Sequence, residues 1–162
     1  MDLAFRLANL LVLPAWFLLV FFPHRGLTRW TAAVVVPALI AIGYLTLFVE
    51  GLLAPTFPGD PAAAAHSQAL QNLFANPTLA DIKVLFSDER TLVVGWMHYL
   101  AFDLLVAGWI ARDARRVGLR HVFIVPSLLC TLMLGPAGWL SYMAIKLVAG
   151  KPLTPEDSTS ET

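Results

Sequence analysis

The chain has 162 residues, of which 58% are apolar and only 14% are charged, and its mean hydropathy is +0.71. This composition is typical of an integral membrane protein rather than of a soluble domain. The formal net charge of zero argues against a nucleic-acid partner, and the single cysteine excludes an intrachain disulfide and a thiolate metal cluster.

Four runs are long enough to cross a bilayer, which takes about 20 predominantly apolar residues. They cover residues 3–22, 31–49, 91–110 and 122–148. Pro23 ends the first run, which lacks the small-residue cleavage pattern of a signal peptide, so we expect it to be a retained helix. The sequence therefore predicts an all-α fold, a polytopic membrane protein built as a bundle of four transmembrane helices.

The connection over residues 51–90 has two parts. Residues 53–65 contain three prolines, namely Pro55, Pro58 and Pro61, and are predicted to form an irregular loop. The residues after Pro77 instead repeat apolar side chains at helical spacing, at Leu79, Ile82, Leu85 and Phe86. We expect a short interfacial helix at about residues 78–86, between the second and third transmembrane helices.

The fourth run contains Gly135, Pro136 and Gly138, which we interpret as packing or kink positions. Lys146, near the end of this run, is expected to extend its ammonium group to the lipid headgroups. Residues 1–150 are predicted to form a single transmembrane domain, and residues 151–162 a disordered polar tail.

Basic residues indicate the orientation. The loops after the first and third runs share one side of a four-helix bundle, and they carry Arg25, Arg29, Arg112, Arg115, Arg116 and Arg120. The positive-inside rule makes these loops cytoplasmic and leaves both termini outside. The sequence thus predicts a multi-pass protein of the inner (plasma) membrane, with the lipid bilayer as its principal partner.

The third run carries two ionisable side chains, His98 and Asp103, close to the centre of the crossing. An ionised aspartate at that depth costs about 2.5–3.5 kcal/mol on insertion scales, so Asp103 should face the bundle interior. Such a residue is a candidate for a functional site. The alternative interpretation is a buried hydrogen bond that joins two helices.

Spacing limits how His98 and Asp103 could act together. Five residues along an α-helix correspond to about 140° of rotation and about 7.5 Å of rise, so the two side chains point in different directions. His98 shares its face with Phe102, whereas Asp103 shares its face with Tyr99. A joint acid/base site therefore needs a cavity wide enough for both side chains to reach its wall.

Other polar and aromatic side chains within the runs could line a pocket around this pair. The predicted pocket residues are Asn9, Tyr44, Trp96, Tyr99 and Tyr142. His24, His66 and His121 match no metal-ligand spacing, and the chain contains no phosphate-binding glycine loop. We therefore expect neither a metal nor a cofactor.

Two segments resemble the neoxanthin-synthase-like family, also called abscisic acid deficient 4-like. They are residues 86–92 (FSDERTL) and 96–104 (WMHYLAFDL). The resemblance extends to residues 9–16, to Arg112-Asp113 and to residues 127–136 with Gly138, so it covers nearly all of the chain except the loop and the tail. Plant members of this family are plastid membrane proteins needed to convert violaxanthin to neoxanthin.

The resemblance implies a redox-neutral rearrangement without a cofactor, in which an epoxide oxygen gains a proton while a neighbouring carbon loses one. Such a reaction needs an acid and a base in a site with little water. His98 and Asp103 would be this catalytic pair, and the substrate would be an epoxy-carotenoid or a related isoprenoid.

Two alternatives remain open from the sequence. A non-catalytic carotenoid- or lipid-binding or assembly protein would need the same polar pocket but no aligned proton-transfer groups. Proton or ion transport would need only the aspartate near the middle of the membrane. Whether the chain is an enzyme is therefore undecided at this level.

Overall fold

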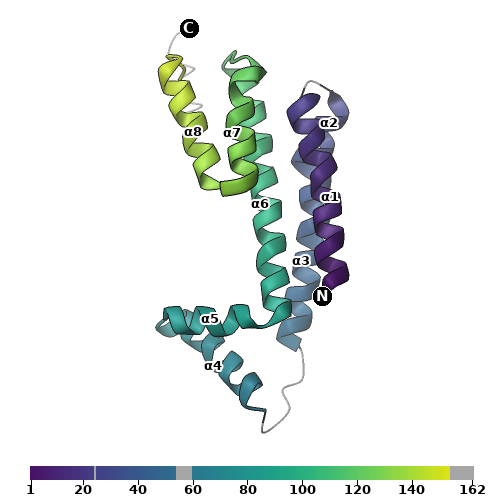
Figure 1. Cartoon of the computed structure of the whole chain (residues 1–162), viewed down its shortest axis with the longest axis vertical. Coiled ribbons are helices and arrows are strands. Elements are labelled where there is room, and N and C mark those ends of the chain that lie inside the picture. Colours follow the sequence, from purple (N-terminus) through teal and green to yellow (C-terminus); the bar gives the residue numbers. More distant parts are fainter. Residues whose placement is uncertain (24, 54–59, 154–162) are drawn as a thin grey trace.

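The computed structural model describes residues 1–23, 25–53 and 60–153, and within this part every regular element is a helix (Figure 1). The prediction of an all-α fold is therefore confirmed. The predicted tail falls largely on residues 154–162, which lie outside the described residues.

Three helices are long and apolar enough to cross a membrane. The first is α1 (Asp2–Phe21), and the third is α6 (Glu89–Arg116). The second, Gly26–Leu53, is continuous through α2 (Gly26–Trp30), the π-helical segment η1 (Thr31–Val35) and α3 (Val36–Leu53). These three spans confirm the first three predicted runs.

The π-helical segment of the second span has an identifiable cause. Pro37 follows η1 and has no N–H group to donate to the carbonyl group one turn earlier. A wider turn before a proline relieves the clash between its ring and that carbonyl group. The helix therefore continues through Pro37 instead of ending there.

The fourth predicted span, residues 122–148, is wrong as a single crossing. The chain instead forms α7 (His121–Leu134) and α8 (Pro136–Val148), which run in opposite directions and meet at Gly135 (Figure 1). Their 14 and 13 residues extend about 21 Å and about 20 Å at 1.5 Å per residue. Each is shorter than the hydrocarbon core of a bilayer, about 30 Å. The α7–α8 hairpin therefore lies beside one half of α6 and turns back near its middle.

Three residues explain this reversal. Gly135 has a φ angle of +44°, in the left-handed region that favours glycine. Pro136 is the first residue of α8, where its missing N–H group removes no helical hydrogen bond. A Cβ atom at Gly138 would lie 2.3 Å from the backbone nitrogen of Thr131, so only glycine permits this approach of α8 to α7. The role of Gly138 in packing was thus predicted correctly. At Gly135 and Pro136, however, the chain reverses its direction instead of only bending.

The hairpin changes the predicted placement of the chain ends. Four crossings would bring both termini to one end of the bundle. Three spans and a hairpin place the N-terminus at one end and the end of α8 at the other, the end at which α2 also lies (Figure 1). Which end faces the cytoplasm stays a prediction from the basic loops.

Two shorter helices lie between α3 and α6. The first, α4 (Pro61–Ala75), begins inside the segment predicted as an irregular loop, because the Asp60 carboxylate accepts a hydrogen bond from the Ala62 N–H at 2.9 Å. The second, α5 (Leu79–Ser87), confirms the helix predicted at about residues 78–86. Thr78 and Asp81 form a capping box at its start. Figure 1 shows α5 crosswise at the N-terminal end of α6.

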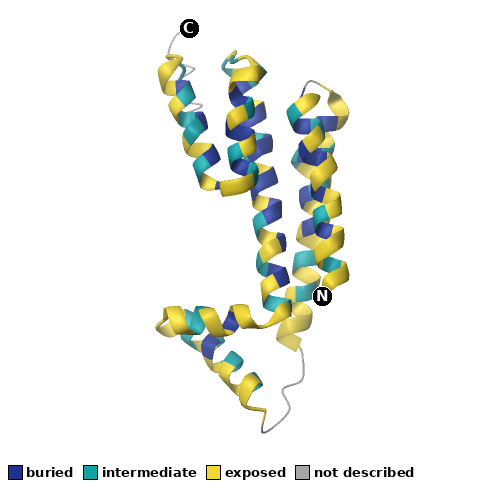
Figure 2. Ribbon diagram, viewed as in Figure 1, coloured by how far each residue is buried: buried dark blue, intermediate teal, exposed yellow. Residues whose placement is uncertain are grey.

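The central element is α6, which contacts α1, α3, α5, α7 and α8. Buried residues lie along α6 and on the surfaces that face it, whereas the outer surfaces of α1, α3, α7 and α8 are exposed (Figure 2). Many of these exposed side chains are large and apolar, as expected for surfaces in contact with lipid.

Candidate functional site

Asp103 occupies the middle of α6, about 21 Å along the helix from Glu89 and about 20 Å from Arg116 at 1.5 Å per residue. Its side chain is buried, with 8% of the residue exposed. It lies against the tip of the α7–α8 hairpin, since a Cβ atom at Gly135 would be 2.8 Å from its Oδ1 atom. The Oδ2 atom is buried and has no hydrogen-bond partner within the described structure. Asp103 therefore has an unpartnered carboxyl oxygen at the tip of the hairpin.

Tyr99 stands one helical turn before Asp103 on the same face of α6. The Tyr99 hydroxyl donates a hydrogen bond to the Leu132 carbonyl oxygen at 3.3 Å. This oxygen has no helical partner because the residue four positions later is Pro136, which lacks an N–H group. The break in the hairpin thus creates the acceptor that Tyr99 uses.

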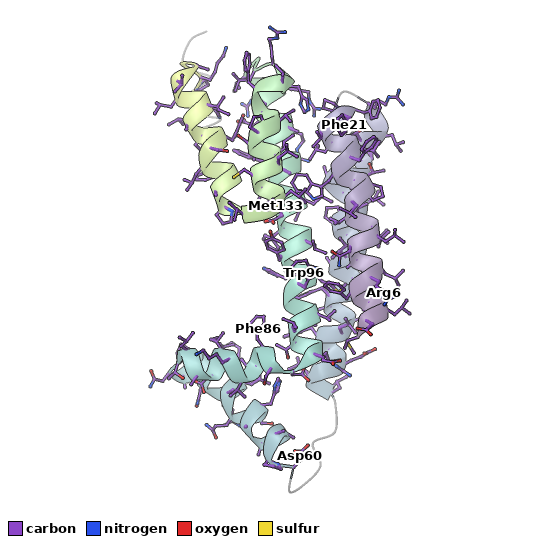
Figure 3. All side chains as sticks on the ribbon, viewed as in Figure 1. Arg6, Phe21, Asp60, Phe86, Trp96 and Met133 are labelled. Atoms are coloured by element: carbon purple, nitrogen blue, oxygen red, sulfur yellow. The ribbon has the colours of Figure 1, made fainter. Side chains whose placement is uncertain are left out.

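Trp96 and Asn9 continue this surface towards α1. The Trp96 ring centroid is 5.5 Å from that of Tyr99, and its indole N–H donates to Asn9 Oδ1 at 3.4 Å. Asn9 in turn donates to the Phe5 carbonyl oxygen at 2.7 Å. Trp96 lies on the part of α6 beyond the hairpin tip (Figure 3). Three of the predicted pocket residues, Asn9, Trp96 and Tyr99, are therefore brought together, and Tyr99 lies one helical turn from Asp103.

His98 lies on another side of α6. Its ring is exposed, stacks on Phe102 with a centroid distance of 4.5 Å, and lies 5.7 Å from the ring of Tyr44 on α3. Asp103 faces the hairpin instead. The structure therefore brings His98 and Tyr44 together and leaves both apart from Asp103, as the rotation of about 140° requires.

Tyr142 belongs to a second buried polar cluster. Its hydroxyl group donates to Asp113 Oδ2 at 2.7 Å, and the Lys146 ammonium group donates to the same atom at 2.7 Å. Asp113 is ten residues beyond Asp103, about 15 Å along the helix. Lys146 is only 1% exposed, so the expectation that it reaches the headgroups is wrong. Tyr142 is therefore separate from the Asp103 site.

The sequence analysis missed Asp113 because the third span was expected to end at residue 110, which put Asp113 in a loop. A signal was present on the partner helix. Tyr142 and Lys146 are four residues apart and share one face of α8, so both could reach one acceptor on a neighbouring helix.

An apolar cavity of about 270 Å³ lies between α6 and α8 and is broadly open to the surface. Its lining residues are Phe102, Leu105, Val106, Trp109 and Trp139. Trp139 is one turn beyond Gly135, so the cavity lies near the hairpin tip. Phe102 stacks on His98 and points about 100° away from Asp103 around α6, so the cavity lies on the His98 side of the helix. Neither His98 nor Asp103 lines it.

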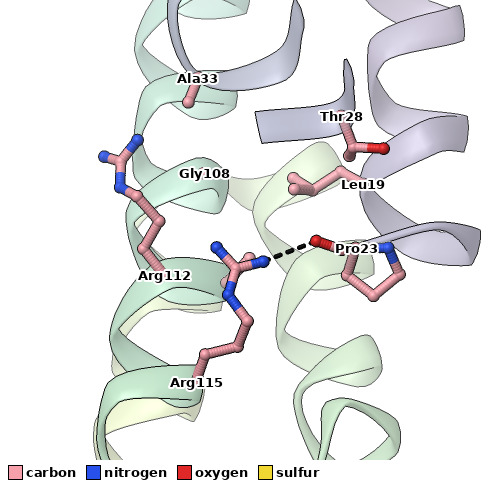
Figure 4. A pocket seen from close by; sticks show the side chains of 8 residues that line it. Leu19, Pro23, Thr28, Ala33, Gly108, Arg112 and Arg115 are labelled. Atoms are coloured by element: carbon pink, nitrogen blue, oxygen red, sulfur yellow. Dashed lines mark hydrogen bonds between the residues drawn. The ribbon is translucent and has the colours of Figure 1, made fainter. Parts of the chain in front are cut away.

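A smaller cavity, of about 10 Å³, lies at the α2 end of the bundle between α1, η1 and α6 (Figure 4). Arg115 spans it and donates a hydrogen bond to the Pro23 carbonyl oxygen at 2.6 Å. A space of this size holds about one water molecule, so we interpret it as a packing feature. Within residues 1–23, 25–53 and 60–153, no cluster of side chains is suited to hold a metal ion.

Comparison with known proteins gives one family assignment. No curated protein and no solved structure matches the chain. A family model described as ABA DEFICIENT 4-like matches residues 3–142. This match covers most of the chain and includes Asp103, Asp113 and the hairpin tip. It agrees with the family resemblance of the segments around Trp96 and Asp103, and the chain belongs to the ABA DEFICIENT 4-like family.

Proposed function

We propose that the chain is a membrane isomerase of an epoxy-carotenoid or related isoprenoid, and that Asp103 is the group that transfers protons. The observation that carries this proposal is the buried Oδ2 atom of Asp103, which has no hydrogen-bond partner in the described structure. A buried polar atom without a partner is costly unless a ligand satisfies it. Family membership agrees with a membrane-embedded role.

The surroundings of Asp103 favour its protonated form. A tyrosine hydroxyl has one proton, and Tyr99 donates it to the Leu132 carbonyl oxygen, so this proton does not stabilise an Asp103 carboxylate. The Oδ2 atom of Asp103 is buried without a partner, and a neutral carboxyl group costs less than a charged one in the middle of the membrane.

A single carboxyl group can serve both halves of the rearrangement. The proton of Asp103 moves to the epoxide oxygen as the carbon–oxygen bond opens. Asp103, now a carboxylate, takes a proton from the neighbouring carbon, whose C–H electrons form the new double bond. The substrate becomes an isomeric alcohol and Asp103 regains its proton, so no oxidant or cofactor is needed.

In this proposal the polar residue that accompanies Asp103 is Tyr99, in place of the predicted His98. Tyr99 shares a helical face with Asp103, whereas His98 is exposed and stacks on Phe102. The hydrocarbon chain of the substrate would lie in the cavity between α6 and α8, whose aromatic walls suit a rigid polyene. Trp139 of the cavity is one turn from Gly135, which borders Asp103, so a long ligand that passes the hairpin tip could contact both.

The second candidate is a carotenoid- or lipid-binding protein without catalysis. The apolar lining of the cavity favours it, because binding a hydrocarbon chain needs no proton transfer. Transport rests only on the depth of Asp103 in α6 and has no further support among the described residues.

The test is conversion of an added epoxy-carotenoid by the purified protein in lipid nanodiscs, followed by chromatography. We expect the Asp103→Asn variant to lose at least 100-fold in rate, and His98→Ala to retain most of it. Circular dichroism and size-exclusion profiles identify variants that still fold. Loss of rate in His98→Ala with retention in Asp103→Asn would contradict the proposed site. Bound pigment without any conversion by the unmodified protein would favour the second candidate.

A further inference from the structure

The cluster of Asp113, Tyr142 and Lys146 is buried and takes no part in the proposed chemistry. We infer that these three are positioning residues, which hold the base of the α7–α8 hairpin against α6 and so determine where its tip lies relative to Asp103. That the cluster affects catalysis at Asp103 rests on the proposed function. That it fixes the position of the hairpin tip does not.

The contacts at the base of the hairpin are short and charged. Two α8 side chains converge on one oxygen atom of Asp113, each at 2.7 Å. The Lys146 ammonium group also donates to the Leu153 carbonyl oxygen at 3.3 Å, which ties the segment after α8 to the same point. The ring of Trp109 packs edge-on against Tyr142 at a centroid distance of 5.9 Å. Charge-assisted hydrogen bonds of this kind are stronger than neutral ones.

The tip of the hairpin is held differently. Its one described hydrogen bond to α6 is the 3.3 Å contact from Tyr99 to Leu132. Met133 and Leu134 at the tip are 68% and 64% exposed, so their side chains make few contacts with the bundle. The charged contacts of the hairpin to α6 thus lie at its base, whereas nearer the tip α7 is held by burial, at Leu128 and Thr131.

The close contact between α7 and α8 transmits the position of the base to the tip. Gly138 lies against the backbone of Thr131, so the two helices are in direct contact one turn from Gly135. Displacement of α8 at Lys146 therefore displaces Gly135, which borders Asp103. The cluster would therefore act on the site through the hairpin. Along α8, Lys146 is 11 residues from Gly135, or about 17 Å.

A spin label at the tip tests this inference without requiring turnover. The label is introduced by Met133→Cys in a Cys130→Ser background, which removes the chain's only native cysteine. A matched label at Leu45→Cys on α3, where the side chain is 56% exposed, reports on the rest of the bundle. Electron paramagnetic resonance in nanodiscs then compares the label at each site with and without Lys146→Met.

We expect Lys146→Met to increase the mobility of the tip label severalfold and to leave the Leu45 label unchanged. Adding Asp113→Asn to Lys146→Met should restore much of the tip order, because no unpaired charge then stays buried. An unchanged tip label in Lys146→Met, or an equal change at both labels, would overturn the inference. If the tip responds as expected but the protein converts no epoxy-carotenoid, the proposed function fails and the positioning role stands.

Discussion

Gly138 and Thr131 lie in direct backbone contact across the α7–α8 hairpin, with 2.3 Å between the Thr131 nitrogen and the place where a Cβ atom of residue 138 would be. No side chain larger than hydrogen fits there without moving one helix. The hairpin therefore depends on this glycine for its closed form.

The Gly138→Ala variant should consequently be destabilised by about 1–3 kcal/mol, the usual cost of overpacking. Thermal unfolding in detergent, followed by tryptophan fluorescence, measures this loss. Leu140→Ala on the same helix is the matched control, because Leu140 is 60% exposed and its truncation leaves the contact intact. Equal melting temperatures for Gly138→Ala and the unmodified protein would contradict the close approach of the helices.

Removal of the Tyr99 hydroxyl should affect both stability and turnover. Tyr99→Phe removes the hydrogen bond to the Leu132 carbonyl oxygen, which is half-buried, at a cost of about 0.5–1.5 kcal/mol. It also removes the polar group one turn from Asp103 on the same helical face, so we expect conversion to fall by about 10-fold or more. Tyr44→Phe on α3 is the control and should change neither quantity. If the two variants behave alike in the conversion assay, Tyr99 is no partner of Asp103.

The aromatic walls of the α6–α8 cavity should determine how well a hydrocarbon ligand is retained. Truncation by Phe102→Ala or Trp139→Ala removes part of the lining and should weaken pigment retention by about 10-fold, equivalent to about 1.4 kcal/mol. Trp30→Ala, at an exposed position on α2, serves as the control. Retention is measured by extracting pigment after purification at equal detergent concentration. Undiminished retention in both cavity variants would exclude this cavity as the ligand site.

Asp81 makes the stability of the α4–α5 segment depend on pH. Hydrogen bonds from the Thr78 hydroxyl and from Asn72 lower the pKa of Asp81 below its ordinary value of 3.8. A lowered pKa contributes stability that is complete above the ordinary value and is lost as the pH falls through the folded-state value. The contact between α4 and α5 should therefore loosen only below about pH 4.

Limited proteolysis of the α4–α5 segment with an acid-active protease, over pH 2 to 6, checks this expectation. Asp81→Asn should make cleavage rapid and nearly independent of pH in this range, because the variant has no carboxylate to protonate. If cleavage of the unmodified protein instead became faster as the pH rises, the predicted effect of Asp81 on stability would be wrong.

The sequence predicted the three spans well because each is a long apolar run with clear ends, such as Pro23 after α1. It failed at α4, where Pro61 suggested a loop although a proline at the first helical position is well tolerated after a cap such as Asp60. Local composition could not separate these two possibilities.

The hairpin and the site were harder to predict for the same physical reason. Apolar composition is equal for one long span and for two short helices, and only the succession of Gly135 and Pro136 marked the reversal. Asp103 was found because its burial in a membrane is costly. Its neighbours at Gly135 and Leu132 depend on that reversal, so they could not be identified before the fold was known.

The reversal at Gly135 makes the two leaflets of the membrane unequal for this protein. On the flank of α6 that faces the hairpin, α7 and α8 lie beside one half of the helix, whereas Figure 1 shows no helix beside the other half down to α5. A lipid-soluble molecule that diffuses within the membrane would thus reach Asp103 from the leaflet nearer α5, while its counterparts in the opposite leaflet meet protein.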